Sequence, residues 1–210
     1  MICIPVKKIS PDSFEKKLKT AQKLADIIEI WFDELERFHD KELKKIFDLK
    51  KRPYIYKSTK LNNLEKILKY PLEYVDFDVN TPIKIIQKVK KISPKTKIIL
   101  SFHDYGKTPP KIELLKIIDK MLEKNAEIVK IACYANTFLD SLSMMEILSE
   151  LYYKDQKAIC VCMGEEGKIT RTAGHLLGNY LMYAPIKISE KTAKGQIKAE
   201  ELGKIQNLLK

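Results

Sequence analysis

The chain has 210 residues, of which 45% are hydrophobic and 32% are charged, a composition ordinary for a globular protein. No Pro-, Gly- or Ser-rich linker divides it, so we expect a single domain over residues 1–210. Apolar runs stop well short of a membrane span, and the N-terminal segment lacks the length of a signal peptide. We therefore expect a cytoplasmic protein with no membrane partner, whose four cysteines are reduced thiols.

The net charge is +11, from 39 basic and 28 acidic residues. The lysines are scattered over nearly every expected helix, as in KKLKTAQK and KVKKISPK, and form no patch interleaved with aromatic residues. A nucleic-acid binder more often clusters its charge, whereas any basic protein attracts small anions. The composition thus argues against a nucleic-acid partner and is compatible with an anionic small-molecule substrate.

Expected strands and helices alternate along the whole chain. Short apolar runs predict eight strands, at Ile2–Val6, Ile27–Phe32, Tyr54–Tyr56, Tyr74–Val79, Ile98–Phe102, Ile128–Cys133, Ala158–Met163 and Leu181–Ile188. A helical pattern follows each of them, at Pro11–Leu24, Lys41–Leu49, Leu61–Lys69, Pro82–Lys91, Pro110–Glu123, Phe138–Tyr153, Thr172–Asn179 and Ala199–Leu209. This spacing is typical of βα repeats.

Eight βα units predict a parallel sheet with right-handed crossovers, closed into a (β/α)8 TIM barrel, although 210 residues is compact for that fold. The alternative is an open doubly wound sheet. No G-x-G-x-x-G motif follows the first strand and no phosphate loop is present, which weakens the nucleotide-binding version of that alternative. In a barrel the catalytic residues lie at the C-terminal ends of the strands.

A lysine lies in the middle of the sixth expected strand. The segment AEIVKIA places Lys130 among β-branched residues, with no carboxylate in the strand beside it. Burial in such a setting lowers the pKa of a lysine, and a neutral amine can form a Schiff base with a ketone. The alternative is an edge strand, or a side chain that extends its ammonium to water. Cys160 and Cys162 are expected to be buried small residues and not metal ligands, because their spacing is not that of a zinc site.

Four motifs, in order, resemble the type I 3-dehydroquinate dehydratase family. ILSFHDYGKTP is similar to that family's His-Asp strand end, and AEIVKIACYANT to its lysine strand. CMGEEGKITRTAGHLLGN resembles the stretch after strand seven, and KTAKGQI the loop that closes over substrate. The resemblance runs over nearly the whole chain and is strongest in its second half.

The resemblance implies a Schiff-base hydro-lyase of the shikimate pathway, which makes aromatic amino acids. Lys130 would form an imine with the C3 ketone of 3-dehydroquinate, and His103 would remove the C2 proton and return a proton to the departing C1 hydroxyl. The product would be 3-dehydroshikimate, with no metal or redox cofactor. The resemblance also implies a homodimer. Further substrate-binding residues that it implies are Glu29, Lys57, Met163, Arg171, Thr192 and Gln196. Met163 and Tyr183 match apolar walls of that family's pocket.

The first half departs from the family pattern. The strand-two motif Glu-x-Arg-x-Asp reads Glu29-Ile-Trp31-Phe-Asp33, and Lys57 replaces the strand-three arginine. Leu61 lies near the position of the glutamate that orients the catalytic histidine, so Asp78 and Asp104 are the candidates to replace it. Two alternatives therefore stay open: a divergent or inactive relative acting on another ketone, and a protein that only binds a small anion.

Overall fold

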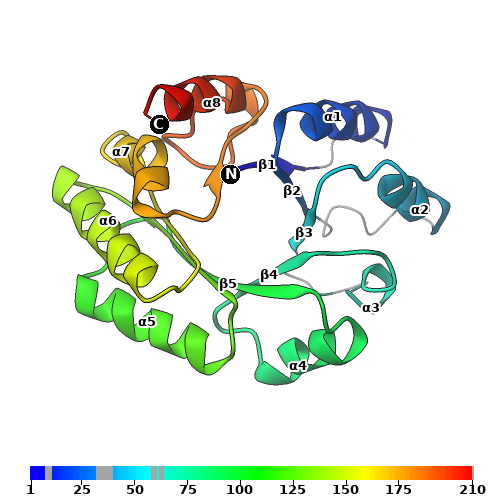
Figure 1. The fold of residues 1–210 in the computed structure, drawn as a ribbon, viewed down its shortest axis with the longest axis horizontal. Coiled ribbons are helices and arrows are strands. Elements are labelled where there is room, and N and C mark those ends of the chain that lie inside the picture. The colour runs from blue at the N-terminus through cyan, green and yellow to red at the C-terminus, as the bar shows by residue number, and fades with distance from the viewer. Residues whose placement is uncertain (8–10, 32–39, 58–60, 62–63, 210) are drawn as a thin grey trace.

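The computed structural model describes residues 1–7, 11–31, 40–57, 61 and 64–209. Eight strands form one parallel sheet in the order β7-β6-β5-β4-β3-β2-β1-β8. Figure 1 shows this sheet curling round on itself, so that first and last strands in the sheet order approach each other. The predicted (β/α)8 barrel is confirmed. The strands are β1 Ile2–Val6, β2 Ile27–Trp31, β3 Tyr54–Lys57, β4 Tyr74–Asp78, β5 Lys97–Asp104, β6 Ile128–Tyr134, β7 Ala158–Met163 and β8 Met182–Tyr183.

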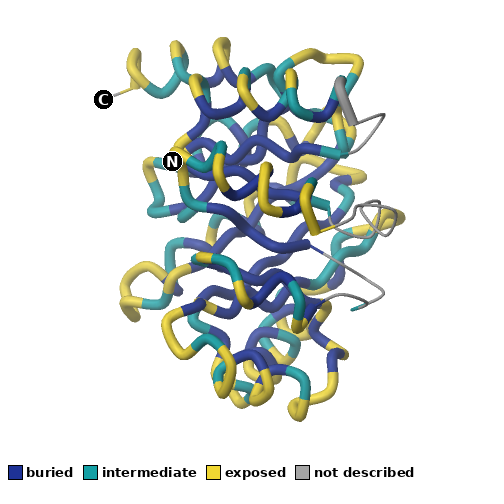
Figure 2. The backbone as a smooth tube through the Cα atoms, turned by 90° about the vertical axis from the view of Figure 1, so that its right-hand side faces the viewer, coloured by how far each residue is buried: buried dark blue, intermediate teal, exposed yellow. Residues whose placement is uncertain are grey.

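Helices surround the strands as an outer ring (Figure 1), and Figure 2 shows buried residues concentrated on the strands and exposed residues on the outer helices. The helices are α1 Pro11–Leu24, α2 Asp40–Asp48, α3 Leu64–Ile67, α4 Ile83–Ile92, α5 Lys111–Glu123, α6 Phe138–Tyr153, α7 Lys168–Thr172 and α8 Ala199–Leu208. Helices such as α2, α4 and α5 bury apolar side chains against the sheet, as expected for amphipathic crossovers. No helix within the described ranges is long and apolar enough to cross a membrane.

Strand alternation divides the barrel interior into two layers. At the N-terminal end an apolar floor is made of Cys3, Ile27, Ile55, Tyr74, Ile99, Ile128, Ile159, Leu181 and Tyr183. Two residues further along their strands, the same faces carry polar side chains. We call this second set the polar layer; it consists of Glu29, Lys57, Asp76, Ser101 and Lys130, all buried. The floor thus closes one end of the barrel, and of its members Tyr183 also lines the cavity that opens at the other end.

The barrel closes between β7 and β8 through side chains as well as backbone. Tyr180 N donates to Ala158 O at 2.8 Å. The next two outward amides of β7 find side-chain acceptors: Cys160 N donates to Asn179 Oδ1 and Cys162 N to Thr170 Oγ1, both at 2.8 Å. These bonds provide acceptors for backbone amides at the edge of β7, which the two-residue strand β8 is too short to pair with.

The seventh helix and eighth strand differ from their predicted bounds. The predicted helix at Thr172–Asn179 is instead α7 followed by a 3-10 helix at Gly174–Leu177. The 3-10 helix ends at Gly178, because its left-handed φ of +85° is incompatible with a further helical turn. The side chain of the next residue, Asn179, then accepts a hydrogen bond from Cys160 N of the sheet. The strand predicted at Leu181–Ile188 covers only Met182–Tyr183, because Pro185 has no amide to donate to a ladder.

The third helix is also shorter than predicted. It covers Leu64–Ile67 rather than 61–69, and Leu61 has a left-handed φ of +56° that a helix does not accommodate. The end of the predicted second strand, Phe32, and the motif residue Asp33 lie outside the described part of the chain.

Candidate active site

A cavity of about 570 Å³ opens at the C-terminal ends of the strands. In TIM-barrel enzymes the catalytic residues lie at this end of the barrel. Side chains from seven strands, β2 to β8, and from the loop before α8 converge on it. All eight residues that the sequence singled out line this cavity: Glu29, Lys57, His103, Lys130, Met163, Arg171, Thr192 and Gln196.

Lys130 lies deep in the polar layer with 5% of its surface exposed. Its Nζ is 2.7 Å from Asp76 Oδ2 and 3.5 Å from Glu29 Oε2, and it donates to the Tyr183 hydroxyl at 3.1 Å. Burial alone lowers the pKa of Lys130, but the two carboxylates outweigh it and hold that pKa above its ordinary value. The expectation of a depressed pKa is therefore wrong for the empty site. The carboxylates come from β4 and β2, which the sequence of β6 could not reveal.

Asp76 holds two lysines at once. Its Oδ1 accepts from Lys57 Nζ at 2.8 Å, and its Oδ2 accepts from Lys130. Burial raises the pKa of this carboxyl, but the charges of the two lysines more than offset it and hold the pKa below its usual range. Lys57 Nζ also donates to Ser101 Oγ at 3.2 Å. The polar layer is thus a connected ionic network in which Asp76 is the central anion.

His103 lies on the same sheet face as Lys130, one strand away. Ser101 pairs with Lys130 in the β5–β6 register, and His103 is two residues further along β5. Burial, with the charges of Lys130 and Lys57, lowers the pKa of His103 to about 3. A half-buried imidazole in this field is neutral near pH 7 and can accept a proton.

The two aspartates considered as partners of His103 bond elsewhere. Asp78 Oδ1 accepts from Asn80 N at 2.8 Å, and Asp104 Oδ1 accepts from Gly106 N at 2.9 Å. The His103 ring instead stacks on Tyr105, with 6.1 Å between ring centroids. Among the described residues, neither carboxylate is hydrogen-bonded to His103.

The depressed pKa of His103 gives a pH prediction. A group with a folded-state pKa near 3 stays unprotonated throughout the physiological range, so kcat/KM should be flat from about pH 8 down to about pH 5. A profile that falls on the acid side with a midpoint near the ordinary histidine value of about 6.5 would contradict it. The His103 ring signal in a 13C NMR titration, assigned with His103→Asn, tests the protonation state directly.

Arg171 is a buried cation without a carboxylate partner among the described residues. Only 4% of its surface is exposed, and its Nε atom makes no hydrogen bond. Burial lowers the pKa of the guanidinium to about 10, so it remains charged at neutral pH. A buried charge of this kind is costly unless an anion pairs with it. The planar guanidinium, facing the cavity, suits a bidentate carboxylate.

Replacing Arg171 with Met should separate stability from activity. Removing an unpaired buried charge should leave the free energy of unfolding unchanged or raise it, by up to about 4 kcal/mol. The same change should lower kcat/KM by about 10²- to 10³-fold, because the substrate carboxylate loses its partner. Urea denaturation and steady-state kinetics test both. Arg171→Lys is the comparison, since it keeps the charge but loses the planar fork; full activity with Met would refute the anion site.

The loop between β8 and α8 covers one side of the cavity. Gln196 is 5% exposed, and its Oε1 accepts from Thr192 N at 2.7 Å. Gly195, at φ +81°, lies so close to Gly164 that a Cβ would be 2.4 Å from the Gly164 carbonyl oxygen. Lys194 O also accepts from Gly164 N at 3.2 Å. The loop is therefore docked on the end of β7, with Thr192 and Gln196 at the cavity edge.

Trp31 occupies the place of a family arginine. Its Nε1 donates to Glu29 Oε1 at 2.8 Å, while Glu29 Oε2 has no hydrogen bond and is left facing Lys130. Lys7 Nζ lies 3.9 Å from the Trp31 ring centroid. The lost positive charge is thus replaced in part by a lysine over the ring face.

Sequence reasoning missed two members of the site. No role was predicted for Asp76. It is a charged residue within the apolar strand YVDFD, and this is the same kind of signal that singled out Lys130. Tyr183 was expected as an apolar wall, and its hydroxyl contact with Lys130 depends on the barrel closing. Cys160 and Cys162 are buried in the layer between sheet and helices, as expected of small core residues.

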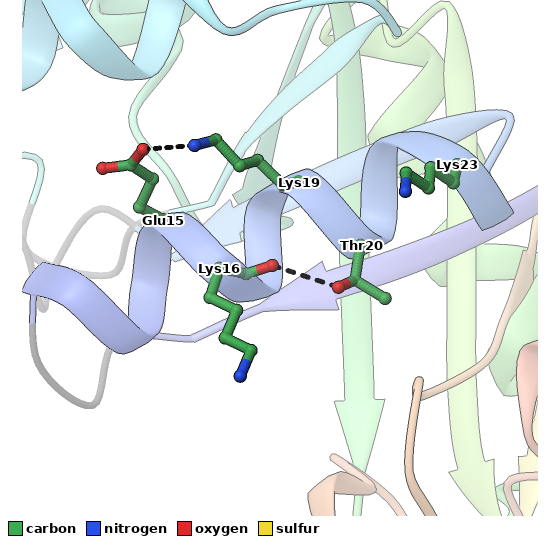
Figure 3. Close-up of a pocket in the computed structure, with 5 residues that line it drawn as sticks. All are labelled: Glu15, Lys16, Lys19, Thr20 and Lys23. Atoms are coloured by element: carbon green, nitrogen blue, oxygen red, sulfur yellow. Dashed lines mark hydrogen bonds and ion pairs between the residues drawn. The ribbon is translucent and has the colours of Figure 1, made fainter.

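A second hollow, of about 410 Å³, lies on the outer surface of the molecule. Figure 3 shows that its lining residues all come from α1, with Glu15 paired to Lys19 at 2.7 Å. Three lysines give it a basic character: Lys16, Lys19 and Lys23. It combines no residues from separate elements, unlike the cavity at the strand ends.

The barrel and its cavity define an α/β-barrel protein equipped for lysine-dependent carbonyl chemistry, with, at one end, a buried amine, a neutral imidazole and a guanidinium that no described carboxylate pairs with. Comparison with known families gives a specific assignment. The chain belongs to the type I 3-dehydroquinate dehydratase family, because the family model described as Type I 3-dehydroquinase matches residues 2–210. Enzymes of this family are hydro-lyases that work through a Schiff base.

Relatives and solved structures agree with this assignment. The 3-dehydroquinate dehydratase of Methanocaldococcus jannaschii is 32% identical over 228 residues, covering 100% of this chain and 99% of that protein. The Methanococcus vannielii protein of the same name is 31% identical over 225 residues and is covered in full. The type I enzyme of Clostridium difficile, solved with covalent modified comenic acid, superposes with a TM-score of 0.84 at 26% identity, over 99% of this chain and 91% of that one.

Proposed function

We propose that this chain dehydrates 3-dehydroquinate to 3-dehydroshikimate through an imine on Lys130. The observation that carries the proposal is the cavity itself, in which a buried amine and a buried, unpaired guanidinium are held within one space. The substrate offers a ketone for the first and a carboxylate for the second. Family membership supports the same reaction.

The residues divide the chemistry as follows. Lys130 attacks C3, and the iminium that results withdraws electrons, which acidifies the C2 proton. His103, neutral at working pH, removes that proton and returns one to the C1 hydroxyl as the C1–O bond breaks and water leaves. Hydrolysis of the product imine then releases 3-dehydroshikimate and the free amine.

Substrate binding falls to the rest of the lining. Arg171 pairs with the carboxylate, while Glu29 and Lys57 lie where substrate hydroxyls would reach the polar layer. Thr192 and Gln196 close the cavity from the loop, and Met163 gives an apolar wall. The reaction as proposed needs no metal or redox cofactor, because the iminium serves as the electron sink.

Cellular context and assembly are also proposals. We infer a single barrel domain over residues 1–210, a cytoplasmic location and a place in the shikimate pathway. A homodimer is supported by exposed apolar side chains at the start of α6: Phe138, Leu139 and Leu142 are 49%, 73% and 46% exposed. Light scattering on the purified protein tests the oligomeric state.

Borohydride trapping tests the proposed reaction. The folded protein is mixed with 3-dehydroquinate, reduced with borohydride and examined by mass spectrometry of the intact chain and its peptides. We expect one reduced adduct, on Lys130. A folded protein that forms no adduct would show that the barrel is retained without the chemistry. An adduct only with other ketones would assign a different substrate, as the Trp31 replacement of a family arginine allows.

A further inference from the structure

Lys130 Nζ has one uncharged polar neighbour, the hydroxyl of Tyr183, at 3.1 Å. Nζ also lies 4.2 Å from the centroid of the same ring. Tyr183 is 8% exposed and lines the same cavity as Lys130, so a ketone bound to Nζ would lie close to its hydroxyl. The sequence indicated only an apolar wall at this position, and that role makes no use of the hydroxyl.

Imine formation from a charged lysine moves two protons. The ammonium carries three protons and the iminium nitrogen carries one, while the ketone oxygen leaves as water with two. The two protons that Nζ loses therefore equal the two that the oxygen gains, and no outside acid or base is needed. A group that contacts both Nζ and the oxygen is sufficient to transfer them.

Of the described groups that hydrogen-bond or ion-pair with Nζ, which are Asp76, Glu29 and Tyr183, the Tyr183 hydroxyl is the one that can both accept and donate a proton. Asp76 has one oxygen bonded to Lys57 and the other to Lys130, and its depressed pKa keeps it ionised, so it has no proton to donate. Glu29 Oε2 is further away, at 3.5 Å. Burial and the nearby carboxylate of Glu29 raise the pKa of Tyr183 well above its ordinary value, so its hydroxyl is protonated.

We propose that the Tyr183 hydroxyl relays protons from Lys130 Nζ to the substrate ketone oxygen during imine formation. In the first transfer Nζ gives a proton to the phenolic oxygen while the phenolic proton moves to the ketone oxygen, and the freed nitrogen lone pair bonds to C3. In the second, the carbinolamine nitrogen gives up a proton by the same route. The C3–O bond then breaks, water leaves, and the nitrogen lone pair forms the C=N bond.

This relay rests on the proposed function and adds a catalytic residue to it. The hydroxyl is uncharged before and after each transfer, and the total charge of the Lys130 nitrogen and the reacting ketone group stays at one positive unit throughout. Asp76 and Glu29 stabilise that charge in both the ammonium and the iminium. The ionic network can therefore keep Lys130 protonated in the empty site without preventing its reaction.

Tyr183→Phe tests the relay because it keeps the ring and removes one oxygen. The variant and the wild-type chain are mixed with 3-dehydroquinate and quenched into borohydride at increasing times, which gives the rate of adduct formation on Lys130. We expect a fall of about 10²-fold. Affinity for the corresponding alcohol, in which the C3 ketone is reduced, should stay within about twofold, because that ligand forms no imine. Tyr180→Phe, which removes a hydroxyl bonded only to Tyr74 at the floor, is the matched control and should trap at the wild-type rate.

The outcomes separate this relay from the reaction on which it rests. A wild-type adduct together with an equally fast adduct in Tyr183→Phe would overturn the relay alone. Equal losses of trapping rate and of alcohol affinity would also overturn it, since Tyr183 would then only shape the cavity. A folded wild-type chain that forms no adduct would remove both the relay and the proposed function.

Discussion

Replacing Lys130 with Met should reduce the dehydration rate by about 10⁴-fold or more. The change removes the amine that forms the imine, while Asp76 and Glu29 each keep another partner. Asp76 stays paired with Lys57, and Glu29 stays bonded to Trp31. We therefore expect a folded, inactive protein that still binds substrate through Arg171.

Three measurements check this expectation. Formation of 3-dehydroshikimate is followed by its absorbance, circular dichroism reports folding, and borohydride trapping should give no adduct. Lys120→Met, at an exposed position on α5, is the control for losing a lysine elsewhere. A Lys130→Met protein with more than about a tenth of wild-type activity would show that dehydration does not pass through this imine.

Asp76→Asn should lower the free energy of unfolding by about 3–5 kcal/mol, which is a large part of the stability of an ordinary domain. The substitution keeps the shape of the side chain but leaves two buried ammonium groups without their shared anion. Lys130 would retain Glu29, at 3.5 Å, and the uncharged Tyr183 hydroxyl, at 3.1 Å. Breaking one partner of a buried ion pair is costly because the other charge stays buried.

Urea denaturation at pH 7 measures this effect. Asp78→Asn is a matched control, since Asp78 is on the same strand, is exposed and accepts only from the backbone of Asn80. It should cost no more than about 1 kcal/mol. Combining Asp76→Asn with Lys57→Met should be less destabilising than the sum of the two changes, because the double variant removes a charge pair together. A loss below about 1 kcal/mol for Asp76→Asn would mean that the lysines find other partners.

The chain's periodicity determined the fold. Regular alternation of apolar strands with amphipathic helices was enough to predict eight parallel strands, because each βα unit is a local pattern. The bounds that differed, at the seventh helix and eighth strand, depend on non-local bonds. Asn179 and Thr170 bond to amides of β7, and no local pattern indicates which strand a side chain will contact.

The sequence also determined which side chains reach the cavity. Lys130 pairs with Ser101 on the neighbouring strand, and His103 lies two residues after Ser101. Side chains alternate between the two faces of a strand, so Lys130 and His103 both point to the inside of the barrel. The predicted lining set was therefore recovered without coordinates. Motif resemblance supplied the loop members Thr192 and Gln196, which periodicity could not have found.

Only the tertiary structure decided the charge state of that cavity. The ionisation of Lys130 depends on carboxylates that come from strands 54 and 101 residues earlier in the chain, Asp76 and Glu29. The contact with Tyr183 forms only when β8 returns to β1 and closes the barrel. Electrostatic energies depend on distances between such side chains, and those distances are set by packing of the whole barrel. For this reason the residues that line the cavity could be predicted from the sequence, whereas the pKa direction predicted for Lys130 was wrong.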